Sequence, residues 1–278
     1  MKSNPYLQVL LAILIMGSSG ALIKYLSLPP TTLSFFRMAV PAGLLFLYFR
    51  VRKVNLFRYP PGLMLIGSGL NALRIFLFIL SFSYTSISNA VLILNSWPVF
   101  VNIFSIFFLG EKVPRRNLLL LILPISGILL LFVDQPFSLE NEDFVGMSAM
   151  LLSAMLYSVT IIIFKRESPK YSGYETTFFQ NLAGAFIFLP FLWYEDYDYS
   201  LEQIGLGIVY AFMVGILAFG LYFSALRKIK ASTISFLSYL EVLVATSFGI
   251  LLFDEVLTWN IIAGGVLIIV STILLKKQ

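Results

Sequence analysis

Three charged residues lie within long apolar segments of the sequence: Arg37, Arg74 and Glu241. An arginine in such a place can hold a carboxylate through two parallel hydrogen bonds, and a glutamate can take an amine or a proton. Charges inside hydrocarbon usually face the interior of a helix bundle, and a buried charge needs a partner. These three residues are therefore the first candidates for a ligand site.

Arg74 and Glu241 lie near the middle of their segments, and two interpretations compete. The two residues could pair with each other permanently. Alternatively, Arg74 takes a substrate carboxylate while Glu241 takes an amine or a proton. We favour the second interpretation, which predicts a zwitterionic or amphipathic metabolite such as an amino acid. Arg37 lies about six residues from the outer end of its segment, roughly 9 Å along a helix, so it could extend outward. For Arg37 a structural role, as an ion-pair partner or an interface anchor, is as well supported as a role in the site.

Polar and aromatic residues at similar depth extend the candidate site. Asn71 precedes Arg74 by one helical turn on the same face. The further candidates for substrate binding are Asn95, Trp97, Tyr157, Tyr222 and Tyr239. Tyrosine at the end of a span is usually an interface anchor. Because Tyr157 and Tyr222 lie deeper, lining a cavity is as well supported for them as anchoring.

The composition excludes several kinds of chemistry. The 278 residues contain no cysteine and no histidine, which excludes disulfides, thiolate nucleophiles, Cys/His metal sites and histidine-based catalytic triads. No phosphate-binding GxxxxGK[ST] loop occurs, so an ATP-driven pump is not supported. We predict no enzymatic activity, no catalytic residue, no cofactor, no bound metal and no nucleic-acid partner.

Membrane-spanning helices must position the candidate residues. Hydrophobic residues make up 59% of the chain and charged residues 12%, whereas soluble domains have about 45–50% and about 25%. A helical span needs about 20 apolar residues, and strand-type alternation is absent. We therefore predict an all-α integral membrane protein with ten transmembrane helices. The segments are Tyr6–Leu26, Thr31–Phe49, Pro61–Tyr84, Ser88–Leu109, Asn117–Val133, Phe144–Phe164, Thr176–Trp193, Ile204–Leu226, Ser232–Phe253 and Thr258–Leu275.

The charges outside these segments predict an orientation. The chain has 19 lysines and arginines. When the connections are assigned alternately to the two sides of the membrane, every one of them falls on the same side, apart from Lys24, Arg37 and Arg74. Short basic loops mark the cytoplasmic side. We therefore expect both termini in the cytoplasm, a multi-pass protein of the inner (plasma) membrane, and contacts between its basic rim and anionic lipid headgroups.

The chain contains a weak internal repeat. Ser81–Val113 aligns without gaps with Ala225–Leu257, so that Ser88 coincides with Ser232 and Glu111 with Glu255. We predict two halves of five spans, residues 1–136 and 137–278. Because five is odd, the second half is inverted, an arrangement characteristic of secondary transporters, with a substrate site near the midplane.

Small residues in the fifth and tenth segments predict that these helices take part in a close helix–helix contact. Ser126-Gly127 and Gly264-Gly265 allow helix backbones to approach closely. They are typical of packing within one chain or of a homodimer face.

Several short motifs carry a family resemblance over essentially the whole chain. They are Phe35-Phe36-Arg37, Leu109-Gly110-Glu111, Ser238-Tyr239-Leu240-Glu241, Phe253-Asp254-Glu255-Val256-Leu257-Thr258 and Gly264-Gly265-Val266-Leu267-Ile268. With them the chain resembles the drug/metabolite transporter superfamily, specifically its ten-helix EamA-type members, each with two EamA repeats. It departs from that pattern at Glu241-Val242, where members often have Glu-Pro, and Arg74 is not a family-wide feature.

The resemblance implies a metabolite carrier, often an exporter, that works by alternating access between the repeats. The substrate would be a small molecule. Two alternatives stay open: an integral membrane enzyme or lipid-handling protein, and a passive channel.

Overall fold

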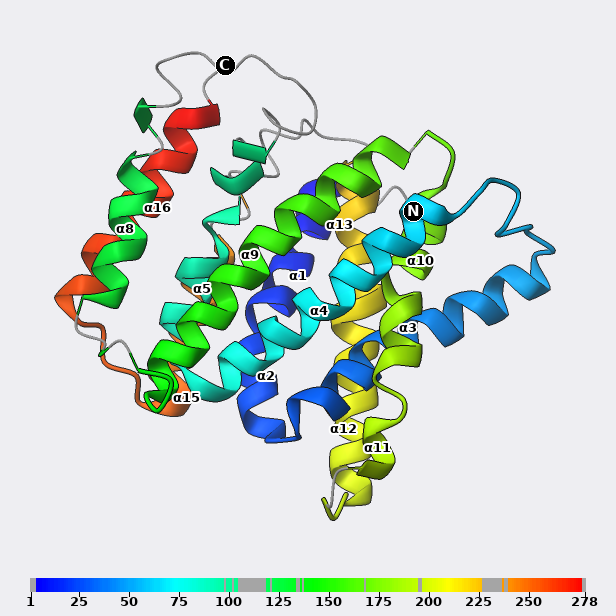
Figure 1. Ribbon diagram of the computed structural model, residues 1–278, viewed down its shortest axis with the longest axis horizontal. Helices are drawn as coiled ribbons and strands as arrows, with labels where there is room; N and C mark the ends of the chain where they lie inside the picture. Colours follow the sequence, from blue (N-terminus) through cyan, green and yellow to red (C-terminus); the bar gives the residue numbers. More distant parts are fainter. Residues whose placement is uncertain are drawn as a thin grey trace.

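The computed structural model describes residues 4–97, 99–101, 103–104, 119–120, 122–133, 136, 138–167, 169–194, 197–226, 237 and 240–276. All regular secondary structure in these residues is helical (Figure 1). The helices are α1 (Pro5–Gly17), α2 (Ser19–Leu26), α3 (Pro30–Val51), α4 (Gly62–Tyr84), α5 (Ile87–Leu94), α8 (Ile122–Phe132), α9 (Glu142–Glu167), α10 (Gly173–Ile187), α11 (Phe191–Tyr194), α12 (Leu201–Phe212), the π-helix η1 (Met213–Ala218), α13 (Phe219–Leu226), α15 (Leu240–Phe253) and α16 (Trp259–Lys276).

Six helical segments of the described chain are long and apolar enough to cross a membrane. They are Pro5–Leu26, Pro30–Val51, Gly62–Tyr84, Glu142–Phe164, Gly173–Tyr194 and Leu201–Tyr222. Shorter apolar helices occupy Ile87–Leu94, Ile122–Phe132, Leu240–Phe253 and Trp259–Val270. The predicted all-helical membrane fold is thus confirmed. The number ten stays a prediction, because parts of the fourth, fifth and ninth predicted segments lie outside the described residues.

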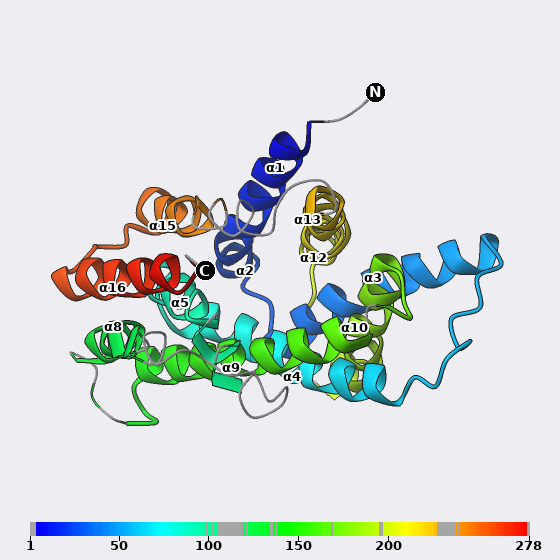
Figure 2. The same cartoon turned by 90° about the horizontal axis from the view of Figure 1, so that it is seen from above.

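Helices from the two predicted halves pack against each other throughout the bundle. The long helices α4 and α9 lie side by side in both views (Figures 1 and 2). Helix α10 packs against α3 and α4, α12 against α3, and α15 against α1 and α5. The fully buried residues Ile79 of α4 and Met147 and Met150 of α9 belong to the largest hydrophobic cluster. The core is therefore built between the halves rather than separately within each.

Helices α8 and α16 approach most closely at the paired glycines. A Cβ atom on Gly127 would lie 2.7 Å from the backbone oxygen of Gly264, and one on Gly264 would lie 2.8 Å from the backbone oxygen of Gly127. Since a backbone atom blocks each position, neither glycine can accept a side chain without moving a helix. These small residues are used for packing within one chain, and a homodimer through the same helices stays a prediction.

An ion pair between an exposed guanidinium and a buried carboxylate joins the two halves at one end of the bundle. Arg58, in the connection after α3, donates two hydrogen bonds to Glu175 in the first turn of α10, at 2.6 and 3.0 Å. The hydrogen bond to Glu175 raises the pKa of the Arg58 guanidinium. Glu175 also accepts from the backbone of Ser172 at 2.7 Å, which completes a capping box. One carboxylate thus both starts α10 and fixes the preceding half against it.

A second carboxylate joins the halves at the other end. Glu255, which follows α15, accepts hydrogen bonds from the backbone nitrogens of Ile87 and Ser88 and from the Ser88 hydroxyl. It thereby satisfies the otherwise unpaired donors at the start of α5, where a negative charge is favoured. Lys24 lies 3.5 Å from the same carboxylate, so three segments of the chain meet at Glu255.

The glycine contact predicts that Gly127→Ala destabilises the protein. The added methyl group must push α16 away, and overpacking of this kind costs about 1–3 kcal/mol. Thermal unfolding in detergent measures the effect. Gly69→Ala in α4 is the matched control, because a Cβ atom there meets nothing within 4 Å, and its melting temperature should be unchanged or higher. Equal melting temperatures for the two variants would contradict the close approach of α8 and α16.

Candidate functional site

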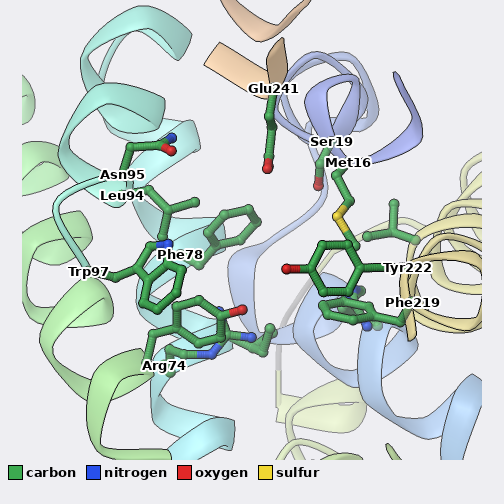
Figure 3. A pocket seen from close by; sticks show the side chains of 14 residues that line it. Met16, Ser19, Arg74, Phe78, Leu94, Asn95, Trp97, Phe219, Tyr222 and Glu241 are labelled. Carbon is green, nitrogen blue, oxygen red and sulfur yellow. The ribbon is translucent and has the colours of Figure 1, made fainter. Parts of the chain in front are cut away.

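A cavity of about 120 Å³ lies inside the bundle, where helices of both halves converge (Figure 3). Its walls combine two guanidinium groups, one carboxylate, several aromatic rings and a few small polar groups. The lining residues are Met16, Ser19, Arg37, Arg74, Ile75, Phe78, Leu94, Asn95, Trp97, Tyr157, Val214, Phe219, Tyr222 and Glu241.

The structure brings most of the predicted site residues together around this cavity. Those that line it are Arg37, Arg74, Asn95, Trp97, Tyr157, Tyr222 and Glu241. Asn71 is not among the lining residues and instead holds the side chain of Arg74. Tyr239 lies outside the described residues.

Arg74 is held in place by neutral hydrogen-bonding groups. Its Nε donates to the side-chain oxygen of Asn71 at 2.9 Å, the one-turn relation expected from the sequence. The Asn71 amide in turn donates to the backbone oxygen of Gln180 in α10 at 2.8 Å, and the Gln180 side chain donates back to Asn71 at 3.3 Å. The guanidinium is therefore oriented without being neutralised, since none of these partners carries a charge.

Helix α9 supports the same part of the wall. The Tyr157 ring lies 4.7 Å from the Arg74 guanidinium, a cation–π contact, and packs edge-on against Trp97 at 5.3 Å. Ser153 donates to the backbone oxygen of Arg74 at 3.0 Å, and Ser158 donates to that of Trp97 at 2.8 Å. Side chains on successive turns of one helix thus fix both α4 and the segment that follows α5.

Arg37 is buried at the cavity rather than extended to the membrane interface. Its side chain is only 5% exposed, and the guanidinium lies 5.7 Å from the Phe219 ring. The Tyr210 hydroxyl lies next to this guanidinium and is 3.1 Å from the Ser19 hydroxyl. Of the roles considered for Arg37, the interface anchor does not fit this position.

Glu241 enters the cavity from the edge opposite Arg74 (Figure 3). The ion pairs formed within the described part of the chain do not include one between Arg74 and Glu241. No described group donates a hydrogen bond to the Glu241 carboxylate. The permanent pairing of Arg74 with Glu241 is therefore absent from this structure, and both charged groups face the cavity.

Three spans lose regular α-helical geometry where they meet the cavity. The first breaks between α1 and α2 at Ser18, next to Ser19. Helix α5 ends at Leu94, and Asn95 follows in a turn. In the third, η1 replaces α-helix around Val214. Interrupted spans are typical of binding sites in transporters, and π-helical turns often occur at functional sites.

The sequence did not single out Ser19, Met16, Phe219 or Tyr210 as site residues. Ser19 is the one with a visible signal, since it belongs to the small-residue run Gly17-Ser18-Ser19-Gly20, which weakens a helix. The others look like ordinary apolar or interfacial residues of a span. Their role at the cavity depends on how the helices pack around the break after α1 and on the π-helix, and the π-helix has no distinct sequence signature here.

Residues 4–133 and 144–276 match the EamA-like transporter family. The chain belongs to this family. Because the match extends over nearly the whole chain, this protein is a multi-pass membrane protein of a transporter family, as the sequence motifs indicated.

Named relatives of this EamA-like chain are transporters. It is 27% identical to a pseudopaline exporter, CntI, of Pseudomonas aeruginosa, over 100% of this chain and 97% of that protein. It is 26% identical to an uncharacterized transporter of Archaeoglobus fulgidus, over 97% and 95% of the two chains. Mouse solute carrier family 35 member G1 is 26% identical over 69% of this chain and 55% of that protein. A solved crystal structure with 18% identity covers 98% of this chain with a TM-score of 0.63, which shows a shared fold.

The Asn71 contact predicts that Asn71→Ala weakens ligand binding although residue 71 does not line the cavity. Without the Asn71 oxygen, the Arg74 guanidinium loses the hydrogen bond that orients it. We expect a loss of about tenfold in affinity, equivalent to about 1.4 kcal/mol. The fluorescence of Trp97 can report binding in a Trp193→Phe/Trp259→Phe background, because Trp193 and Trp259 are more than three-quarters exposed and lie outside the cavity lining.

A suitable control for this prediction is Asn55→Ala. Asn55 lies in the exposed connection after α3 and bonds only locally, to the backbone of Phe57. Unchanged affinity in Asn71→Ala, in a variant that folds normally, would show that Arg74 does not depend on Asn71.

Proposed function

We propose that the protein is a secondary active transporter that exports a small amphipathic metabolite such as an amino acid. The observation that carries this proposal is the central cavity, where buried arginines and a carboxylate on the opposite wall face the same space without pairing. Because unpaired buried charges are unfavourable, a ligand that brings the complementary charges would be strongly favoured there.

Each kind of lining residue has a part in this proposal. Arg74 takes the substrate carboxylate through its terminal nitrogens, while its Nε stays bonded to Asn71. Glu241 takes the amine, or a proton. The rings of Trp97, Tyr157 and Tyr222 form apolar walls around the body of the substrate. A mainly apolar cavity with a few oriented polar groups is the usual form of a small-molecule site.

The packing of the bundle supports alternating access. In this proposal residues 1–136 and 137–278 are inverted repeats that rock against each other around the cavity. The lining residues come from both halves, and the two halves are joined at the ends of the bundle through Glu175 and Glu255. The rocking motion would make and break contacts at these ends while the cavity residues keep their positions.

The direction of transport and the location of the protein are inferred from a relative and from the placement of charges. The name of the Pseudomonas aeruginosa relative, a pseudopaline exporter, supports export. The asymmetry of the basic residues supports an inner-membrane protein with both termini in the cytoplasm. Since Glu241 is the intramembrane carboxylate of the sequence, it is also the candidate for a proton-linked step.

Counterflow in proteoliposomes tests the proposal. Purified protein should exchange a labelled amino acid for internal unlabelled substrate, with saturation. Arg74→Ala and Glu241→Gln should each reduce the exchange about tenfold or more, because each removes a charge-assisted hydrogen bond that is worth about 1.5–3 kcal/mol. Glu142→Gln is a matched control, since Glu142 is exposed at the start of α9; exchange by this variant should stay normal.

Other outcomes would redirect the proposal. Flux that does not saturate and shows no counterflow would indicate a passive channel. Full uptake driven by a pH gradient in Glu241→Gln would exclude the proton-linked role of that residue. A thermal-shift screen against a metabolite library supplies the substrates, and a ligand that stabilises Arg74→Ala as much as the unmodified protein would exclude Arg74 as the carboxylate-binding group.

A further inference from the structure

The charged residues that line the cavity are unequal in number. Arg37 from α3 and Arg74 from α4 both line it, and they are 5% and 6% exposed. They also line a second, smaller pocket together, so both guanidinium groups belong to the same region of the wall. Glu241 alone opposes them among the described lining residues. A zwitterion with one carboxylate and one amine would satisfy Glu241 and one arginine, and would leave the second arginine without a counter-charge.

The second arginine is as firmly positioned as the first. The Arg37 guanidinium packs against η1, where a Cβ atom on Gly215 would lie 3.0 Å from its Nη1. The Phe219 ring lies over the guanidinium and the Tyr210 hydroxyl lies next to it, both from the same span, and Tyr210 is fixed in turn by Ser19. Arg74 has its own support in Asn71, Gln180 and Tyr157.

Both supports are neutral. Of the ion pairs that the described residues form, none involves Arg37 or Arg74. Neutral hydrogen bonds and ring contacts orient a guanidinium but do not cancel its charge. Glu241 reduces the charge of the cavity wall to a net +1. Since a buried charge without a counter-charge is strongly unfavourable, a ligand whose amine pairs with Glu241 must bring two acidic groups, one for each arginine.

From this geometry we propose that the substrate carries two acidic groups and one amine. Arg74 binds one acidic group, Arg37 binds the other, and Glu241 binds the amine. This inference rests on the proposed transport function and narrows it from amphipathic metabolites in general to amino acids or amino-acid conjugates with a second acidic group. Arg37 is then the residue that selects for the second acid.

Matched pairs of an acid and its amide test this inference. Aspartate with asparagine and glutamate with glutamine have nearly the same size, and each pair differs in one carboxylate. Binding is measured by Trp97 fluorescence in the Trp193→Phe/Trp259→Phe background, in a buffer free of carboxylates and at a low, constant chloride concentration. We expect at least one acid to bind about ten to a hundred times more tightly than its amide, the range for one charge-assisted hydrogen bond.

Variants at Arg37 test whether this residue causes the preference for the acid over its amide. In Arg37→Gln the acid and its amide should bind equally, whereas Arg37→Lys should keep part of the preference because it keeps the charge. Arg37→Met, of similar length, is the alternative if Arg37→Gln does not fold. Arg50→Gln is the matched control, since Arg50 lies on the same helix but is exposed; it should leave the preference unchanged.

The outcomes separate this inference from the proposed function. An amide that binds and exchanges as well as its acid would overturn the two-acid substrate and leave amino-acid transport standing. A preference for the acid that survives Arg37→Gln would overturn the role of Arg37. Failure of every acid to bind would overturn the inference, and failure of the amides as well, together with absent counterflow, would overturn the proposed function.

Discussion

Hydrocarbon provides no hydrogen-bonding partner, and this constraint governs every polar group in the bundle. Backbone groups of the spans must bond within helices, and charged side chains must turn inward. The structure follows this rule closely around the cavity, where Ser153 and Ser158 of α9 bond to the backbone oxygens of Arg74 and Trp97. Polar groups that would be exposed to lipid elsewhere are thereby collected into one interior region.

The same constraint explains where helices can be interrupted. A break in a span frees backbone donors and acceptors, so it is tolerated where neighbouring polar side chains or a cavity can receive them. The break at Ser18, the end of α5 and the π-helix η1 all occur beside lining residues. Interrupted helices and buried charges thus occur together at the cavity, because both need polar neighbours that lipid cannot supply.

The bundle combines tight contacts with a few polar connections between its halves. Gly127 and Gly264 allow α8 and α16 to touch at their backbones, and α4 and α9 share a buried apolar core. The connections through Glu175 and Glu255 lie at opposite ends and use charge-assisted hydrogen bonds. Packed contacts between helices have discrete arrangements, and such hydrogen bonds are made or lost as units. In the proposed transport cycle, the connections at the two ends would be the ones made and broken.

The sequence by itself determined the fold class and the depth of the candidate residues. Apolar runs of the right length predicted membrane-spanning helices, and helical periodicity placed Asn71 one turn before Arg74, where it bonds to Arg74. It also placed Arg37, Arg74 and Glu241 within apolar segments, and for Arg37 it left open whether the side chain faces the interior or the interface. These results depend only on the geometry of a single helix, which is the same for any sequence that forms one.

Only the tertiary structure decided how residues of different helices meet. Arg74 and Glu241 could have been partners, but they lie on opposite sides of a cavity. Arg37 could have reached the interface, but Gly215 and Phe219 hold it inside. Ser19 and Tyr210 gained a role through the break after α1 and the position of η1. Distances between helices depend on packing and on such local changes of register, which no periodicity within one segment encodes.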